Sequence, residues 1–298
     1  MPVAARRTVL ALLATGIAAV AAYRAYLWAT TRKPDFVDLS YGPGPRHVLD
    51  IYLPVGSGPF PFVVDIHGGA FKMGSKSMSA PSQALLDAGI AVIRPNYRYS
   101  STDVWPAQGE DCLAAVAFVV ANAGKYRLDP ARLAVWGQSA GGFLAVSTAL
   151  SLIEQGQAPR AVVDFYGPME FSSMDADMAA LGRTASMGTA NAADSAESQL
   201  VGFAVGDDPA AAKAIGPVGR LEAMLPRPLP PLFVRHGDAD PLIAHLQSER
   251  LAAAWARVDP AAQIDLVILP GAGHGGEVFD SDAVMLPLRD FLQAAFAA

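Results

Sequence analysis

The chain has 298 residues, of which 52% are hydrophobic and 17% are charged, and its formal net charge is −6. This length and apolar content suit one large domain with a buried core, and they argue against a disordered chain. The acidic balance excludes a basic surface of the kind that binds nucleic acid. The single cysteine, Cys112, excludes an intramolecular disulfide and a metal site built from several cysteines.

The first 31 residues carry a targeting pattern. Arg6 and Arg7 precede an apolar run at residues 9–23, which Arg24 interrupts before the apolar character resumes. A positive segment before such a run is typical of a signal peptide or a membrane anchor, and a snorkelling Arg24 would let a spanning helix continue. A first helix packed on the domain is the alternative, but the run is apolar on all faces. We therefore expect an exported, periplasmic protein, or one tethered to the membrane with its folded domain outside the bilayer.

Residues 32–44 are polar and rich in proline and glycine, which predicts a linker before a folded domain at residues 45–298. Within that domain, short apolar runs alternate with longer stretches of helical period. The predicted strands are 47–53, 62–67, 91–94, 133–136, 161–166, 232–236 and 265–269. The predicted helices are 79–88, 107–123, 142–154, 242–258 and 283–297. Strands that are apolar on both faces and separated by helices predict a mostly parallel sheet covered by helices on both sides.

Residues 169–229 interrupt this alternation. They are rich in alanine, serine, glycine, aspartate and methionine, and a proline-rich stretch ends them. Because ordinary connections are much shorter, we expect a small inserted lid over a ligand site, placed before the strand at 232–236. A structural excursion without substrate contact is the alternative.

The motif Gly137-Gln138-Ser139-Ala140-Gly141 lies between a predicted strand and a predicted helix. In that context Gly-x-Ser-x-Gly is typical of a nucleophile elbow, whose tight turn leaves no space for side chains on the two glycines. The serine is then exposed at the carboxyl end of the sheet, where open α/β folds bind ligands. Ser139 is therefore the predicted nucleophile.

A second glycine motif, His67-Gly68-Gly69-Ala70-Phe71, follows the predicted strand at 62–67. Small residues there let backbone N–H groups turn toward a substrate carbonyl and stabilise an oxyanion, with the N–H of Ala140 as a further donor. A plain glycine turn is the alternative, and His67 is expected to be structural.

A serine nucleophile needs a base and an acid that orients the base. Asp238 and Asp240 both follow the predicted strand at 232–236, and we favour Asp240, because Asp238 beside a glycine suits the turn itself. His274 lies in a glycine-rich loop after the last predicted strand, where the imidazole has room to reach Ser139. The other four histidines lack that setting.

These motifs resemble those of the α/β-hydrolase fold esterases, in particular the bacterial carboxylesterase and feruloyl/acetyl-esterase-like group allied to hormone-sensitive lipase and kynurenine formamidase. The resemblance covers residues 48–291 and includes two further blocks, at 49–54 and 96–98. Ala70 stands where many hormone-sensitive lipase relatives have glycine, so a bulky tertiary-alcohol substrate is less expected. We expect no helical cap of the kind that those relatives place before the first strand, because the predicted linker and targeting segment occupy the residues there. Carried over by position, the resemblance implies a triad and an oxyanion hole, formed by Ser139, Asp240 and His274 and by the N–H groups of Gly69, Ala70 and Ala140.

The resemblance implies a serine hydrolase that cleaves carboxylic esters of small to medium acyl groups through an acyl-enzyme, without metal or cofactor. A formamidase or other amidase would use the same triad. A catalytically silent interaction protein of the same fold is the alternative of a different class.

Overall fold

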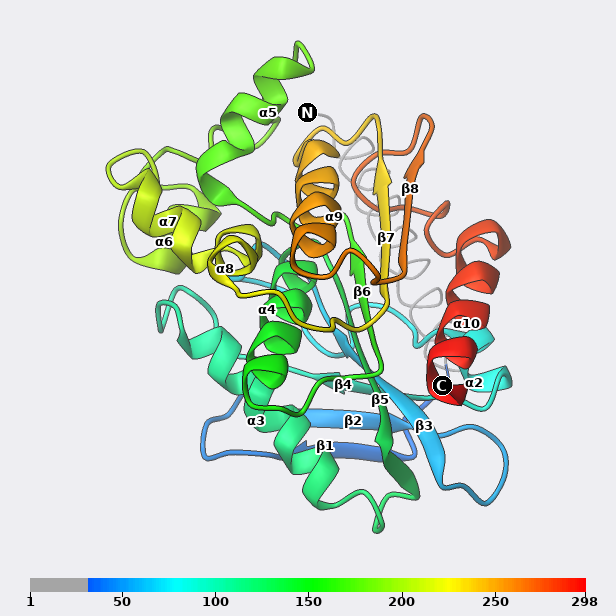
Figure 1. The fold of residues 1–298 in the computed structure, drawn as a ribbon. Helices are drawn as coiled ribbons and strands as arrows, with labels where there is room; N and C mark the ends of the chain where they lie inside the picture. Colours follow the sequence, from blue (N-terminus) through cyan, green and yellow to red (C-terminus); the bar gives the residue numbers. More distant parts are fainter. Residues whose placement is uncertain (1–31) are drawn as a thin grey trace, which may run out of the picture. The chain divides into compact units, whose positions relative to one another are not determined.

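The structure, a computed structural model, describes residues 32–298 (Figure 1). The predictions made for residues 1–31 lie outside the described residues. Within 32–298, no helix combines the length and the apolar character needed to cross a membrane.

An eight-stranded sheet organises residues 34–298, with the strand order β1-β2-β4-β3-β5-β6-β7-β8. Strand β2 runs antiparallel to both of its neighbours, and all the other neighbouring strands are parallel. The mostly parallel sheet is confirmed, so the carboxyl ends of all the strands except β2 lie at one edge. The strands are β1 (Phe36–Ser40), β2 (Val48–Tyr52), β3 (Phe60–Ile66), β4 (Ala91–Pro95), β5 (Leu128–Gln138), β6 (Ala161–Phe165), β7 (Leu232–Gly237) and β8 (Ile264–Leu269).

The linker predicted at residues 32–44 is wrong in part, because β1 lies inside it. Phe36 pairs with Ile51 of β2, and the Phe36 ring packs edge-on against Tyr126 with 4.9 Å between ring centroids. As an edge strand, β1 leaves Val37 and its neighbour exposed, so it carries little of the apolar pattern by which the other strands are recognised. The folded unit therefore begins before residue 45.

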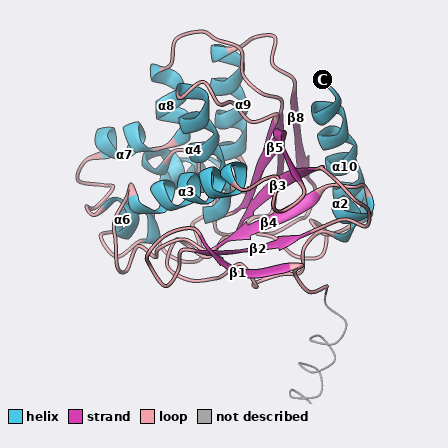
Figure 2. Ribbon diagram, turned by 90° about the horizontal axis from the view of Figure 1, so that it is seen from below, coloured by secondary structure: helices cyan, strands magenta, loops and turns pink. Residues whose placement is uncertain are grey.

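Helices cover both faces of the sheet, and alternate side chains of the strands enter two separate apolar clusters. Val64 of β3 packs with helices α3 (Ala107–Ala121), α4 (Ala140–Glu154) and α9 (Leu246–Val258). Val63 packs with α2 (Gln83–Asp87) and α10 (Asp282–Ala297) on the opposite face (Figure 2). All five predicted helices are present, although α2 and α9 begin four residues later than predicted. At α9 the reason is Asp240, whose carboxylate binds the N–H groups of Leu242 and Ile243 in a turn before the helix.

The insertion at 169–229 connects β6 to β7 and is mostly helical. It contains η1 (Phe171–Ser173), α5 (Met174–Ala180), α6 (Ala196–Val201), α7 (Pro209–Ile215) and α8 (Pro217–Ala223). Two residues of α9 hold it: Gln247 accepts the N–H groups of residues 169 and 170, and the Arg250 guanidinium binds the buried Asp177 carboxylate at 2.6 Å. The insertion is thus fastened to the domain by buried polar contacts.

Among the helices of residues 32–298, α4 is the most deeply buried, and its packing can be tested with a matched pair of leucines. Replacing the fully buried Leu150 by alanine is expected to lower the free energy of unfolding by about 2 to 5 kcal/mol, because it leaves a cavity in the core. Leu225→Ala, at a side chain that is 76% exposed, should change it by less than about 0.5 kcal/mol. Urea unfolding of both variants measures the difference, and equal losses would contradict this packing.

Candidate active site

Ser139 lies in the sharp turn between β5 and α4 with φ 56° and ψ −125°. A Cβ on Gly137 would come within 2.0 Å of the Gly141 carbonyl oxygen, and one on Gly141 would come within 2.0 Å of the Ile66 carbonyl oxygen. Both positions therefore require glycine. The Ser139 N–H donates to the Phe165 carbonyl at 2.9 Å, which ties the turn to β6.

The structure brings Ser139, His274 and Asp240 into one chain of hydrogen bonds. His274 Nε2 lies 2.9 Å from Ser139 Oγ, and His274 Nδ1 lies 2.7 Å from Asp240 Oδ2. The three residues come from loops after β5, β7 and β8, at the edge of the sheet where the parallel strands end. The arrangement places a base beside the serine hydroxyl and an acid behind the base.

Asp240 is 1% exposed, and its surroundings keep it ionised. Burial raises the pKa of this carboxyl, but hydrogen bonds from His236 and His274 and from the N–H of Ile243 outweigh burial and hold the pKa below its ordinary value. Asp238, the alternative weighed from the sequence, accepts the N–H of Gly271 at 2.7 Å and serves the turn. Of the two aspartates, only Asp240 contacts His274.

The loop after β3 contains residues with a left-handed backbone. Gly69 has φ 118°, and Ala70 has φ 50°, which costs a non-glycine residue about 1 to 3 kcal/mol. Ala70, Ser139 and Ala140 line one cavity, and within the described chain the N–H groups of Ala70 and Ala140 donate to no acceptor. Gly69 also lies beside the serine, on the wall of a second cavity.

His67 anchors this loop as a neutral imidazole, because burial lowers its pKa to about 4. Its Nδ1–H donates to the Gly68 carbonyl at 2.6 Å, while Arg46 Nη2 donates to Nε2 at 3.4 Å. The Tyr97 ring stacks on the imidazole at 4.3 Å, and its hydroxyl donates to the His67 carbonyl at 3.0 Å. His67 is thus structural in its contacts, and Arg46 is a supporting residue that no sequence pattern indicated.

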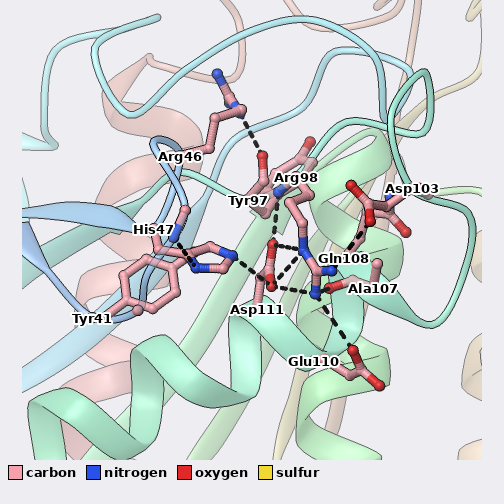
Figure 3. Close-up of polar contacts among 12 residues, drawn as sticks. Tyr41, Arg46, His47, Tyr97, Arg98, Asp103, Ala107, Gln108, Glu110 and Asp111 are labelled. Carbon is pink, nitrogen blue, oxygen red and sulfur yellow. Dashed lines mark hydrogen bonds and ion pairs between the residues drawn. The ribbon is translucent and has the colours of Figure 1, made fainter.

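The block at residues 96–98 is fastened to α3 through Asp111, which is 3% exposed (Figure 3). Asp111 accepts the Arg98 N–H at 2.8 Å and two donors of the Arg98 guanidinium at 2.8 and 3.0 Å, and His47 Nε2 lies 3.1 Å away. This contact holds the segment that follows Tyr97, and because Tyr97 stacks on His67, α3 supports the loop after β3 from a distance. The residues are far apart in the chain, and their spacing alone does not indicate the contact.

No metal site accompanies these residues: within 32–298, no group of three or more His, Cys, Asp and Glu side chains is arranged to hold an ion.

The sheet order, the serine elbow and the Ser-His-Asp geometry define the class of the α/β-hydrolases. The chain belongs to the BD-FAE family, whose model matches residues 49–255. This confirms the fold and the family group expected from the sequence.

Two solved structures and one curated relative illustrate the relationship. Esterase LipQ of Mycobacterium tuberculosis (strain ATCC 25618 / H37Rv) is 29% identical over 256 residues, which cover 80% of this chain and 56% of LipQ. This chain thus spans little more than half of that relative. A truncated form of a carbohydrate esterase from gut microbiota aligns with a TM-score of 0.77 and 26% identity, over 90% of this chain and 98% of the other. Esterase B from Lactobacillus rhamnosis (HN001) aligns with a TM-score of 0.71 and 20% identity, over 99% and 97%, and shows the fold alone.

The Asp111 contact predicts different costs for two neighbouring carboxylates of α3. Asp111→Ala should lower the free energy of unfolding by at least about 2 kcal/mol, because it strips buried donors of their acceptor. Glu110 also touches Arg98, at 3.4 Å, but is 63% exposed, so Glu110→Ala should cost less than about 1 kcal/mol. Chemical denaturation of both variants measures the two losses in the free energy of unfolding. Equal losses would contradict the prediction that Asp111 is the main partner of Arg98.

Proposed function

We propose that the protein is a serine esterase that hydrolyses carboxylic esters of small to medium acyl groups through an acyl-enzyme. The observation that carries the proposal is the continuous chain of hydrogen bonds from Asp240 through His274 to Ser139, at an elbow beside free backbone N–H groups. The esterase names of the relatives support the same reaction class.

In the proposed reaction, Ser139 Oγ attacks the ester carbonyl carbon while His274 Nε2 takes the hydroxyl proton. The imidazolium that forms is stabilised by the Asp240 carboxylate, which accepts its Nδ1–H. Backbone N–H groups of Ala70 and Ala140, with Gly69 at the same loop, stabilise the oxyanion. Collapse expels the alcohol, which takes the proton from His274, and a water molecule then releases the acid by the same two proton transfers.

A cavity of about 120 Å³ beside Ser139, here called the lid cavity, supports the limit on acyl size. Phe71 and Ala140 form its wall on the domain side, and Met174, Met178 and Met187 of the insertion form much of the rest. A short acyl chain fits such a space, whereas a long chain would displace the insertion. In this proposal residues 169–229 act as a lid that measures the acyl group.

The esterase proposal is tested with p-nitrophenyl esters from acetyl to dodecanoyl. Turnover should be highest for the short chains, and Ser139→Ala should lower kcat at least about a thousandfold, as loss of a triad member does. Asp240→Asn should lower it strongly, while Asp238→Asn is its control and should retain most activity.

Two results would overturn the esterase proposal. If a fluorophosphonate labelled the Ser139→Ala variant at the wild-type rate, Ser139 would not be the nucleophile. Faster turnover of N-formylkynurenine than of any ester would make the protein a formamidase.

We also propose that residues 1–31 export the protein or tether it to a membrane, on the strength of their charge and hydropathy pattern. In cell fractionation, the full chain should either appear in the periplasm with a shortened N-terminus or stay with membranes in high salt and be released by detergent. The matched control is residues 32–298 alone, which should remain in the cytoplasm. Release of the full chain by salt alone would argue against an anchor.

A further inference from the structure

Ser139 lies where two cavities meet. The lid cavity extends toward the insertion, and a second cavity of about 400 Å³, here called the Tyr166 cavity, extends toward the loop after β8. The residues that line both cavities are Ala70, Ser139, Met187, Leu242 and His274. An ester bound at Ser139 therefore has two separate spaces for its two substituents.

The proton transfers decide which substituent occupies which space. The leaving oxygen has to lie against His274 Nε2, because the imidazole returns its proton there. The chain continues from His274 into Gly275 and Gly276, and these two glycines line the Tyr166 cavity and not the lid cavity. Of the donors to the oxyanion in the proposed function, Ala140 lines only the lid cavity, Gly69 lines only the Tyr166 cavity and Ala70 lines both, so the oxyanion lies between the two spaces. An alcohol that leaves past the imidazole thus enters the Tyr166 cavity, and the acyl group points under the lid.

Three methionines form an exposed apolar rim around the Tyr166 cavity. Met73, Met78 and Met187 are 52%, 61% and 71% exposed. Exposed apolar side chains gathered at one opening are typical of a ligand-binding surface, and unbranched methionine side chains adapt to ligands of different shape. The rim therefore suits a bulky apolar group and accepts variation in its outline.

The floor of the cavity adds one hydrogen-bond donor beside the nucleophile. Burial raises the pKa of Tyr166, so its hydroxyl stays protonated and donates to Gln138 Oε1 at 3.0 Å. Gln138 lines the cavity, and its Nε2, the other polar atom of the amide, donates to no acceptor among residues 32–298. The two charged residues of the floor, Asp65 and Arg94, satisfy each other at 3.0 Å. The cavity thus offers a neutral donor and no unpaired charge.

We propose that the Tyr166 cavity is the alcohol subsite, and that the preferred substrates are short-chain esters of bulky, uncharged, largely apolar alcohols with a hydrogen-bond acceptor that Gln138 Nε2 can reach. This inference rests on the proposed esterase function and extends it to a substrate class. It makes the alcohol, rather than the acyl group, the larger part of the substrate.

Isomeric esters test the assignment, because they exchange the two sides of the same molecule. Benzyl acetate carries its ring on the alcohol and methyl phenylacetate carries it on the acyl group, and their alcohols have similar acidity. After correction for the rate of each ester with hydroxide, kcat/KM for benzyl acetate should be higher by about tenfold or more, as burial of one ring predicts. The same order is expected for 2-naphthylmethyl acetate over methyl 2-naphthylacetate.

Variants of the rim localise the preference. The double variant Met73→Ala, Met78→Ala changes residues that line only the Tyr166 cavity, and it should lower kcat/KM for 2-naphthylmethyl acetate about fivefold to tenfold while methyl acetate stays within about twofold. Leu225→Ala, at an exposed leucine outside both cavities, is the control and should change neither.

The donor is tested with 2-phenoxyethyl acetate and 3-phenylpropyl acetate, which differ by an ether oxygen in place of a methylene. The wild type should prefer the ether, and Gln138→Leu should lose that preference. If the ratio of kcat/KM for the two esters were the same in the variant and the wild type, Gln138 would not contribute to alcohol recognition.

The outcomes separate the two proposals. No turnover of p-nitrophenyl acetate by the folded wild type would overturn the esterase function itself. Turnover of p-nitrophenyl acetate together with equal or higher kcat/KM for methyl phenylacetate would leave the esterase intact and overturn the alcohol subsite.

Discussion

The left-handed backbone at Ser139 is the constraint on which the rest of the site depends. It raises the hydroxyl above the end of β5 and starts α4 directly behind it, so the N–H of Ala140 is left without a helical partner. The turn exists only because Gly137 and Gly141 let two backbone segments approach within a distance that a Cβ would forbid. The loops after β3, β7 and β8 have to lie beside Ser139 at the same edge of the sheet. Parallel strands allow this, because their carboxyl ends share one edge.

Three buried carboxylates that position loops and helices are each matched by several donors. Asp240, Asp177 and Asp111 are almost fully buried, yet each accepts several hydrogen bonds from named donors. An unmatched carboxylate at such positions would take up a proton instead of holding its charge. The same contacts join loops to helices. Polar pairing thus fixes the positions of the loops, as apolar packing fixes the position of the sheet.

The parts of the fold that sequence reasoning found are those that carry a local signal. Strands buried on both faces read as apolar runs, and the elbow is marked by glycines whose spacing has a steric cause. Strand β1 was not predicted, because its exposed position at the edge of the sheet removes that apolar signal. The Arg46–His67 and Asp111–Arg98 contacts join residues distant in the chain, and only the packed structure shows which donor meets which acceptor. The choice of Asp240 over Asp238 followed from turn chemistry; in the structure Asp240 contacts His274, and Asp238 accepts the N–H of Gly271.

The two cavities differ in how the chain encodes them. The outer walls of the lid cavity come largely from one continuous insertion between β6 and β7, whereas the Tyr166 cavity is assembled at the ends of β3, β4, β5, β6 and β8. Replacement or lengthening of a single surface segment can therefore reshape one side of the serine without disturbing the sheet. On the other side, the inner wall of the Tyr166 cavity is tied to the positions of the strands, whereas its methionine rim comes from loops. Under the proposed assignment, acyl selectivity is free to diverge quickly between relatives, while the inner wall of the alcohol space changes only as fast as the framework allows.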